Sequence, residues 1–254
     1  MEIIFLGVGE AFDESVPNTS MLLTTQSEGR AVTLLLDCGY SVPPRFWQQG
    51  LDAETLDGIW ISHFHADHTF GLPALLVRFW EQRRSGELYI LGQQGIESFV
   101  RKCLDLAYPN FYPRLRFGLR FKEVEPGKTV QALGLSWSTA VNDHPQRNLA
   151  LRLETGKKSL FYSGDGRPTI ETGSLARRVQ LIIHEAFNLA DSVPGHGTIT
   201  GCLEMARVAQ ARTLALVHIQ RQVRKERLQE IKSLASSVHD LEVLVPEVGD
   251  KLII

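Results

Sequence analysis

The sequence has few cysteines and no long apolar run. Cys38, Cys103 and Cys202 are its only cysteines, and they form no Cys-x-x-Cys pair. Their spacing excludes a disulfide-stabilised scaffold and is typical of proteins in a reducing compartment. No apolar stretch approaches the roughly 18 residues of a membrane-spanning helix, and the N-terminus reaches an acid and a glycine too early for a signal peptide. We therefore expect a soluble, cytoplasmic protein with no membrane partner.

The sequence also lacks an excess of charge of either sign. It has 27 Lys and Arg residues against 29 Asp and Glu residues, a formal net charge of -2, so no overall basic field favours nucleic acid binding. It contains no Ser/Pro-rich linker, low-complexity tract or internal repeat. Since 43% of its 254 residues are hydrophobic, the chain can bury a substantial core. We expect a single domain over residues 1–254.

What the sequence does contain is a dense group of metal-ligating residues. His63, His65, Asp67 and His68 fall within six residues, directly after an apolar run at residues 58–61. Because side chains two positions apart on an extended chain share a face, His63 and His65 can bind one cation. Asp67 and His68 lie beyond the bend and can face a second. Imidazole and carboxylate ligands suit Zn²⁺, and also Mn²⁺ or Fe. The spacing therefore predicts two divalent metal ions, with zinc as the first choice.

Periodicity and turn residues predict a mixed order of strands and helices. Strands are expected at residues 2–6, 19–25, 31–37, 58–61, 88–91, 119–123, 129–132, 135–140, 148–153, 159–162, 180–183, 213–217 and 241–245. Helices are expected at residues 74–83, 93–107, 201–211 and 222–236. Because hairpin-linked strands and crossover units both occur, two sheets covered by helices on their outer faces fit this order better than one parallel sheet. The predicted fold class is α/β (α+β).

Further polar groups stand where predicted strands give way to loops. They are His144, Asp165, His184, His196 and His218. Catalytic groups of layered α/β folds tend to lie at such positions, and the glycines around Asp165 would let the backbone approach an ion closely. Taken singly, each position is more typical of a hydrogen-bonded polar residue or an ordinary turn than of a metal ligand.

The order of these residues along the chain carries a resemblance. The residues concerned are His63, His65, Asp67, His68, His144, Asp165 and His218. This order resembles the metallo-β-lactamase superfamily of di-metal hydrolases, over the whole chain. The resemblance implies a four-layer αββα sandwich. It also implies that His144 joins the first metal ion, that His218 joins the second, and that Asp165 bridges the two.

A narrower resemblance is to ribonuclease Z, the branch that processes the 3′ ends of tRNA. The matching segments are residues 5–7, 36–39, 61–73, 94–96, 162–165, 183–186 and 216–218. In that branch a glutamate orients a histidine in a later turn, and the matching residues here are Glu185 and His196. Two small departures occur: Gly197 stands between His196 and the threonine of the turn, and Gly166 follows Asp165 where threonine is usual.

A larger departure from ribonuclease Z concerns the substrate. The branch carries a protruding arm that binds tRNA, inserted between the third-histidine motif and the bridging aspartate. Only 20 residues separate His144 from Asp165, and a predicted hairpin occupies most of them. We therefore expect no arm, and the phosphodiester substrate is either an RNA end or a smaller molecule.

The charges of the expected site predict the reaction. Two cations roughly 3.5–4 Å apart lower the pKa of a bridging water, and the resulting hydroxide would attack phosphorus in line. We expect Asp67 and Asp165 to position it, and His196, held by Glu185, to protonate the leaving group. Arg221 lies three residues beyond His218 and is expected to pair with a substrate phosphate.

Asp37, His184 and His239 are the remaining polar residues considered for the site. Asp37 would either fix the tautomer of a ligating histidine as a buried carboxylate or simply end its strand in a turn. His184 is expected to be structural, because it alternates with Glu185 along one strand. His239 is expected to be solvated.

Two other functions compete with phosphodiester hydrolysis. A hydrolase of the same fold could act on a lactone, thioester or other acyl bond, but such relatives generally lack the pair that Glu185 and His196 form. A redox module is disfavoured, because the di-iron relatives have glutamate at the position of His65. Relatives often pair, so the resemblance also implies a homodimer.

Overall fold

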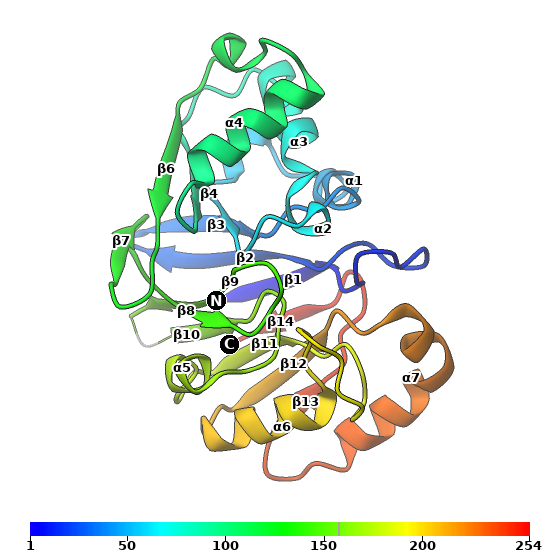
Figure 1. The fold of residues 1–254 in the computed structure, drawn as a ribbon. Coiled ribbons are helices and arrows are strands. Elements are labelled where there is room, and N and C mark those ends of the chain that lie inside the picture. Colours follow the sequence, from blue (N-terminus) through cyan, green and yellow to red (C-terminus); the bar gives the residue numbers. More distant parts are fainter. Residues whose placement is uncertain (157) are drawn as a thin grey trace.

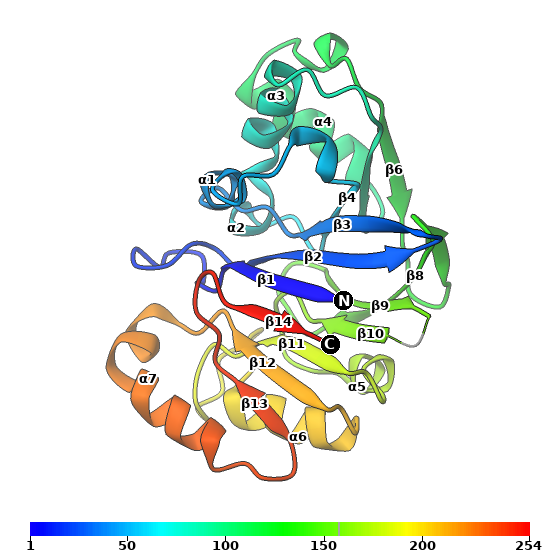
Figure 2. The ribbon, with the colours of Figure 1, turned by 180° about the vertical axis from the view of Figure 1, so that it is seen from behind.

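The computed structural model describes residues 1–156 and 158–254. Two seven-stranded mixed sheets pack face to face, and helices cover the outer face of each sheet (Figures 1 and 2). This is the four-layer αββα sandwich that the resemblance implies.

The first sheet has the strand order β14-β1-β2-β3-β4-β5-β6. Its strands are β1 (Glu2–Gly7), β2 (Ser20–Ser27), β3 (Arg30–Leu36), β4 (Gly58–Ile61), β5 (Leu88–Gly92), β6 (Leu119–Glu123) and β14 (Lys251–Ile253). The outer face is covered by α1 (Val42–Trp47), α2 (Ala66–Thr69), α3 (Leu72–Glu81) and α4 (Ile96–Ala107), with the 3₁₀ turns η1 (Ala53–Thr55) and η2 (Tyr112–Arg114). Strands β3 to β6 are parallel, so their carboxyl ends lie at one edge.

The second sheet has the strand order β13-β12-β11-β10-β9-β8-β7. Its strands are β7 (Val130–Ala132), β8 (Leu135–Asn142), β9 (Asn148–Thr155), β10 (Lys158–Tyr162), β11 (Leu181–Glu185), β12 (Thr213–Val217) and β13 (Glu242–Leu244). Strands β7 to β10 form an antiparallel meander, and β10 to β13 are parallel. The helices α5 (Ile170–Leu175), α6 (Ile199–Val208) and α7 (Arg221–Ser236) cover this sheet.

Three apolar layers hold the sandwich together. The central layer lies between the sheets, where Trp60 of β4 meets Trp137 of β8 at a ring-centroid distance of 6.2 Å. The other two layers lie between each sheet and its helices. Strand β11 shows the alternation that results: Leu181 and Ile183 face the central layer, and Ile182 faces the helices. Glu185 therefore shares the inward face of this strand.

Most of the expected elements are present, with boundaries shifted by a few residues. The helix expected from residue 93 begins at Ile96, because Gly95 adopts a left-handed conformation with φ 87°. Helices α1, α2 and α5 and strand β14 were not predicted. Helices α1 and α5 have only six residues each and α2 has four, too few for a periodic pattern. Strand β14 forms by pairing with β1, from the opposite end of the chain.

The fold gathers the strand ends that carry the polar groups. Between His144 and Asp165, the described residues form only the β9–β10 hairpin, so this part of the chain has no protruding arm, as expected. None of the helices in the described part of the chain combines the length and hydropathy of a membrane-spanning segment.

Candidate metal centre

The metal-ligating cluster lies in the loop after the carboxyl end of β4, which carries His63 and His65, and in the short helix α2, which carries Asp67 and His68. Two glycines from distant segments let other backbones pack against this loop. A Cβ atom at Gly39 would overlap the Asp67 carbonyl oxygen, and one at Gly164, with φ 59°, would lie 2.6 Å from the Ser62 Cβ. Only glycine tolerates such contacts, so these two residues fix the loop beside the ends of β3 and β10.

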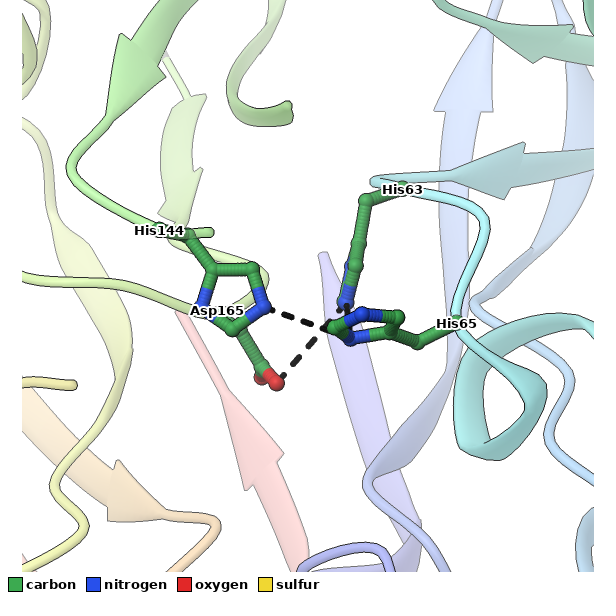
Figure 3. Close-up of side chains that lie close together, drawn as sticks. All are labelled: His63, His65, His144 and Asp165. Atoms are coloured by element: carbon green, nitrogen blue, oxygen red, sulfur yellow. Dashed lines mark hydrogen bonds and ion pairs between the residues drawn. The ribbon is translucent and has the colours of Figure 1, made fainter. Parts of the chain in front are cut away.

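The first group of ligand atoms comes from His63, His65, His144 and Asp165 (Figure 3). His65 Nδ1 lies 3.0 Å from His63 Nε2 and 3.3 Å from His144 Nε2. Asp165 Oδ2 lies 3.8 Å from His63 Nε2. In a tetrahedral zinc site with bonds of about 2.0 Å, neighbouring ligand atoms are separated by about 3.3 Å. The spacing and the donor types therefore fit a bound divalent cation.

The second group of ligand atoms comes from Asp67, His68, Asp165 and His218, all of which are buried. His68 Nε2 lies 3.2 Å from Asp67 Oδ2 and 3.3 Å from Asp165 Oδ1. His218 Nε2 lies 3.5 Å from a carboxylate oxygen of each aspartate. Asp165 belongs to both groups, so the structure brings together all seven residues that the sequence singled out as metal ligands.

Asp37 orients two ligating histidines through the ring nitrogens that do not belong to the ligand group. Its carboxylate is fully buried and accepts hydrogen bonds from His68 Nδ1 at 2.8 Å, Tyr162 Oη at 2.6 Å and Ser62 Oγ at 2.7 Å. Since Ser62 donates its proton to Asp37, its oxygen is free to accept from His63 Nδ1, 3.0 Å away. Both rings are thus held with Nε2 directed at the ligand group. Of the two roles considered for Asp37, the structure supports orientation of the histidines.

Two residues of the site have backbone conformations that are uncommon outside glycine. Asp37 has φ 57° at the end of β3, and His218 has φ 56° at the end of β12. The His218 amide donates to the Val8 carbonyl at 2.8 Å, which ties the end of β12 to β1. Left-handed conformations at such residues cost of order 1–3 kcal/mol each and persist only where the surrounding structure enforces them.

The pKa values of the histidines are shifted in opposite directions in the two groups. Burial lowers the pKa of His63 and His65, and neighbouring imidazoles lower it further. For His68 and His218, burial also acts to lower the pKa, but the negative charge of Asp165 and Asp67 outweighs it. The pKa of His68 is raised well above its ordinary value, and that of His218 is raised to about 9. The charged imidazolium form is therefore favoured at His68 and His218 and disfavoured at His63 and His65.

The two acidic ligands remain ionised. Burial acts to raise the pKa of Asp67 and Asp165, but the charges of the neighbouring histidines outweigh this effect and lower both values below the ordinary range. A pair of ionised carboxylates surrounded by imidazoles is a favourable environment for divalent cations, whose positive charge replaces that of the protons.

The expected proton donor lies beside the second group. His196 Nδ1 is 3.4 Å from Glu185 Oε1, and its ring stacks on Phe187 with centroids 4.3 Å apart. Its ring is also 5.2 Å from that of His144. The structure therefore brings Glu185 and His196 together at the metal centre, as the sequence predicts.

Arg221 lies at the rim of the site and is held there by a residue that the sequence did not reveal. Its Nη1 donates to Glu10 Oε1 at 2.7 Å, and Glu10 is only 2% exposed. The other carboxylate oxygen of Glu10 accepts from the Phe12 amide at 2.8 Å. The Phe12 ring lies 6.0 Å from the guanidinium and is 75% exposed. The Tyr40 hydroxyl donates to the carbonyl oxygen of Ala11, which lies between Glu10 and Phe12 in the chain.

A cavity of about 410 Å³ opens onto these groups. It is lined by Glu10, Ala11, Phe12, Tyr40, His65, Ala66, Asp67, His144, Asp165, Phe187, His196, His218 and Arg221. Glu10, Phe12, Tyr40 and Phe187 were not predicted, because a single acid or aromatic residue in a loop has no distinguishing local pattern. The glycines before Glu10 are the one signal that could have pointed to a close backbone approach.

The two remaining histidines lie away from the centre. His184 is fully buried on the helix-facing side of β11, with its ring 6.1 Å from that of Phe161 and its Nδ1 3.4 Å from Cys202 Sγ. His239 is exposed. The structural role expected for His184 and the solvated position expected for His239 are both confirmed.

Comparison with known proteins places the chain in a family. A family model described as Anti-Pycsar protein Apyc1 matches residues 1–237. A ribonuclease Z of Bacillus licheniformis is 27% identical over 289 residues, which cover 94% of each chain. Because that alignment is longer than the 254 residues of this chain, the relative contains inserted residues that this chain lacks.

Solved structures support the same fold. The metallo-β-lactamase fold protein YhfI of Bacillus subtilis superposes with a TM-score of 0.80 at 20% identity, covering 99% of both chains. The short form of human tRNase Z superposes with a TM-score of 0.79 at 21% identity, covering 100% of this chain and 99% of that one. The chain therefore belongs to the family described as Anti-Pycsar protein Apyc1, within the ribonuclease Z-like branch of the metallo-β-lactamase superfamily.

Proposed function

We propose that this protein is a metal-dependent hydrolase of small phosphodiesters. The observation that carries the proposal is the convergence of two ligand groups that share Asp165, with the Glu185–His196 pair beside them. The ribonuclease Z relative supports phosphodiester chemistry by its name. The family description names an anti-Pycsar protein, and we propose that this chain has that role through the same hydrolysis.

We propose that two divalent ions occupy the centre, with zinc as the first choice and manganese or iron as alternatives. His63, His65 and His144 would hold one ion, Asp67, His68 and His218 the other, and Asp165 both. When bound, the ions would activate a water molecule and offset the negative charge that develops on the phosphate. The mixture of imidazole and carboxylate donors suits these metals better than calcium or magnesium.

Side chains of the protein would orient the attacking water and protonate the leaving group. Asp67 and Asp165 stay ionised in the site and would accept a hydrogen bond from the attacking water, which orients it. His196, on the cavity wall, would donate a proton to the departing oxygen, because its Nδ1 faces the buried Glu185 carboxylate. A carboxylate on one ring nitrogen stabilises the protonated imidazole until the proton is transferred.

We propose that Arg221 orients the substrate phosphate. Its guanidinium lines the cavity, and its salt bridge to the buried Glu10 uses Nη1 while other N–H groups remain available to an anion. Phe12 and Tyr40 form an apolar rim on which an organic group of the ester could pack. A cavity of about 410 Å³ is in the range typical of small-molecule sites, and the described residues include no arm that could hold a tRNA.

The test is a comparison of three substrates with the metal-loaded protein. We expect hydrolysis of bis(p-nitrophenyl) phosphate, little hydrolysis of a p-nitrophenyl acyl ester, and weak cleavage of a precursor tRNA. Faster turnover of the acyl ester would favour the competing acyl hydrolase. Efficient processing of the precursor tRNA at submicromolar concentration would contradict the proposal of a small substrate.

We also propose that the protein forms a homodimer through the surface next to the metal loop. Phe70, at the end of α2, is 55% exposed, and Leu106 of α4 is 85% exposed. They border an apolar depression of about 380 Å³ that includes Pro73 and Tyr108. Contiguous exposed apolar residues of this kind favour contact with a partner. Light scattering should give twice the chain mass, and Leu106→Arg should shift it to the monomer; a monomeric native protein would contradict the proposal.

Two further properties complete the proposal. We propose that residues 1–254 form one domain, because both sheets contribute to the central apolar layer. A single cooperative unfolding transition is expected, and two transitions would contradict the proposal of one domain.

We also propose a reducing compartment, the cytoplasm, because the three cysteines are free in the described structure. Detection of the native protein mainly outside the cytosolic fraction would contradict that location.

A further inference from the structure

Glu185 is a fully buried carboxylate that connects three segments of the metal centre. It lies at the carboxyl end of β11 and is 0% exposed. Its Oε1 accepts the Gly166 amide at 2.9 Å and the Gly197 amide at 2.7 Å. Gly166 directly follows the shared ligand Asp165, and Gly197 directly follows His196. One oxygen atom therefore fixes the backbone on both sides of the centre.

The second oxygen of Glu185 has no hydrogen-bond partner among the described residues, and two imidazole nitrogens of nearby residues share that property. Glu185 Oε2, His196 Nδ1 and His218 Nδ1 are all buried, and none of them makes a hydrogen bond to any residue that the structure describes. One ligand atom from each of these three residues lies within 4.8 Å of the others. Buried polar atoms without partners are costly, at about 1–3 kcal/mol each. Small adjustments that let both imidazoles donate to the carboxylate would remove this cost.

His218 is the residue through which such a contact reaches the metal. Its Nε2 faces the carboxylates of Asp67 and Asp165 at 3.5 Å, so Nδ1 is the nitrogen left for another partner. An imidazole that binds a metal ion through Nε2 must carry its proton on Nδ1. A carboxylate placed at Nδ1 fixes this tautomer, holds the ring in orientation and increases the basicity of Nε2.

We propose that Glu185 is a positioning residue for the second metal ion as well as for His196. The carboxylate accepts hydrogen bonds from Nδ1 of both rings, so the metal ligand and the proton donor share one anchor. This inference rests on the proposed two-metal function, because it assigns Glu185 to the ion held by Asp67, His68 and His218. Its consequence is that loss of the carboxylate charge weakens metal binding, which loss of His196 does not.

The test compares the metal affinity of matched variants. In Glu185→Gln, the amide oxygen can still accept from Gly166 and Gly197, so the fold is retained, but the charge at His218 is lost. We expect its affinity for the second zinc ion, measured by competition with a chromophoric chelator, to fall about 10- to 100-fold. His196→Ala should lose turnover and keep its zinc affinity within about twofold, well short of that 10- to 100-fold loss. Glu204→Gln, at an exposed glutamate of α6, is the matched control and should change neither property.

Several results would overturn the inference. An unchanged zinc affinity in Glu185→Gln would remove the link to the metal, and an equal loss in His196→Ala would place that link in His196 instead. A stoichiometry of three zinc ions would show that Glu185, His196 and His218 form a separate metal site.

A measurement on the native protein covers the case in which Glu185→Gln does not fold. In the zinc-loaded protein, we expect NMR to show a slowly exchanging proton on Nδ1 of His218. A deprotonated Nδ1 would exclude the hydrogen bond to Glu185. Since these readouts concern metal binding and protonation, they are separate from the substrate test: a protein that binds two zinc ions but hydrolyses no phosphodiester would contradict the proposed function and leave this inference standing.

Discussion

The two ligand groups differ both in their donors and in their burial, since the first has three imidazoles and one carboxylate and the second has two of each. In the first, His65 and His144 are only half-buried, and burial together with neighbouring imidazoles lowers the pKa of His63 and His65. In the second, every residue is buried, and carboxylates raise the pKa of His68 and His218. The lowered pKa values of His63 and His65 favour the neutral form that binds a metal ion, whereas the raised pKa values of His68 and His218 make a metal ion compete with protons for these rings. Burial alone does not set the behaviour of a histidine; the nearest carboxylates do.

Asp165 is the residue that the two groups share, and its loss should have the largest effect. Asp165→Ala removes a ligand from both groups, so binding of both ions and turnover should fall by more than the roughly 100-fold that loss of a supporting residue can cost. Metal content by atomic absorption and the rate with bis(p-nitrophenyl) phosphate measure this. His65→Ala is the control for loss of one ligand from the first group alone. If Asp165→Ala still bound two ions tightly, the groups would be independent.

Substitution of Asp37 should weaken the binding of the two metal ions to different extents, because Asp37 contacts the two ligand groups differently. It accepts directly from His68 but reaches His63 only through Ser62. Asp37→Asn should therefore weaken the second ion about 10- to 100-fold and the first ion less, as measured by stepwise chelator competition. An equal loss at both positions would show that Asp37 supports the loop as a whole. The variant Asp57→Asn, at a carboxylate paired with Arg30 far from the centre, is a suitable control.

The protonation of the second group predicts a different pH dependence for each ion. Between pH 6.5 and about 9, the raised pKa of His218 favours its protonated form in the metal-free protein. The second ion must displace that proton, so its affinity should rise about tenfold per pH unit for each proton displaced. The first ion should show little dependence there, because the pKa values of His63 and His65 lie below their ordinary value. Calorimetry in buffers of different ionisation enthalpy counts the protons released. Release of equal numbers of protons on binding of the first and the second ion would contradict the predicted difference between the two groups.

The same protonation predicts how the stability of the metal-free protein depends on pH. The folded-state pKa of His218, about 9, is above the ordinary value of 6.5. Its contribution to the free energy of unfolding is therefore complete below pH 6.5 and is lost as the pH rises through about 9. Thermal unfolding in the presence of a chelator should show Tm falling over this interval. A Tm that rose there would indicate a neutral His218 in the metal-free fold.

Ser62 should give the smallest effect and act on the first group only. Ser62→Ala removes the oxygen that links His63 Nδ1 to Asp37, and a single hydrogen bond of this kind contributes about 0.5–1.5 kcal/mol. The first ion should bind a few-fold more weakly and the second should be unaffected. Chelator competition at fixed pH can resolve this difference. A larger effect on the second ion would show that the Ser62 hydroxyl, which donates to Asp37, acts mainly by holding that carboxylate against His68.

Much of the fold and the ligands His63, His65, Asp67 and His68 followed from local patterns, whereas the resemblance assigned the ligands His144, Asp165 and His218. Strands such as β4, β6 and β12 were predicted with their observed boundaries because each is a short β-type run with clear turn residues at its ends. The missed elements lacked such a pattern, and β14 exists only through its pairing with β1. The resemblance to ribonuclease Z identified the branch but did not distinguish it from the narrower Anti-Pycsar protein Apyc1 family, which the family model matches.

The supporting residues of the site could not be predicted for a physical reason. Tyr162 reaches Asp37 across 125 positions of the chain, and Arg221 reaches Glu10 across 211. No periodicity or motif connects residues at such separations, because the contacts arise only when the sheets pack. The sequence also left two roles open for Asp37, which the burial of its carboxylate and its contact with His68 decide.

The amino-acid sequence by itself determined which donor atoms are available and in what order, because a ligand's chemistry and the period of a strand are local properties. Only the tertiary structure decided that the pKa values of His68 and His218 are raised while those of His63 and His65 are lowered, that Asp37 contacts His68, and that Glu185 lies close to His218 as well as to His196. These outcomes depend on distances of a few ångströms between residues far apart in the chain, and packing of the two sheets sets those distances.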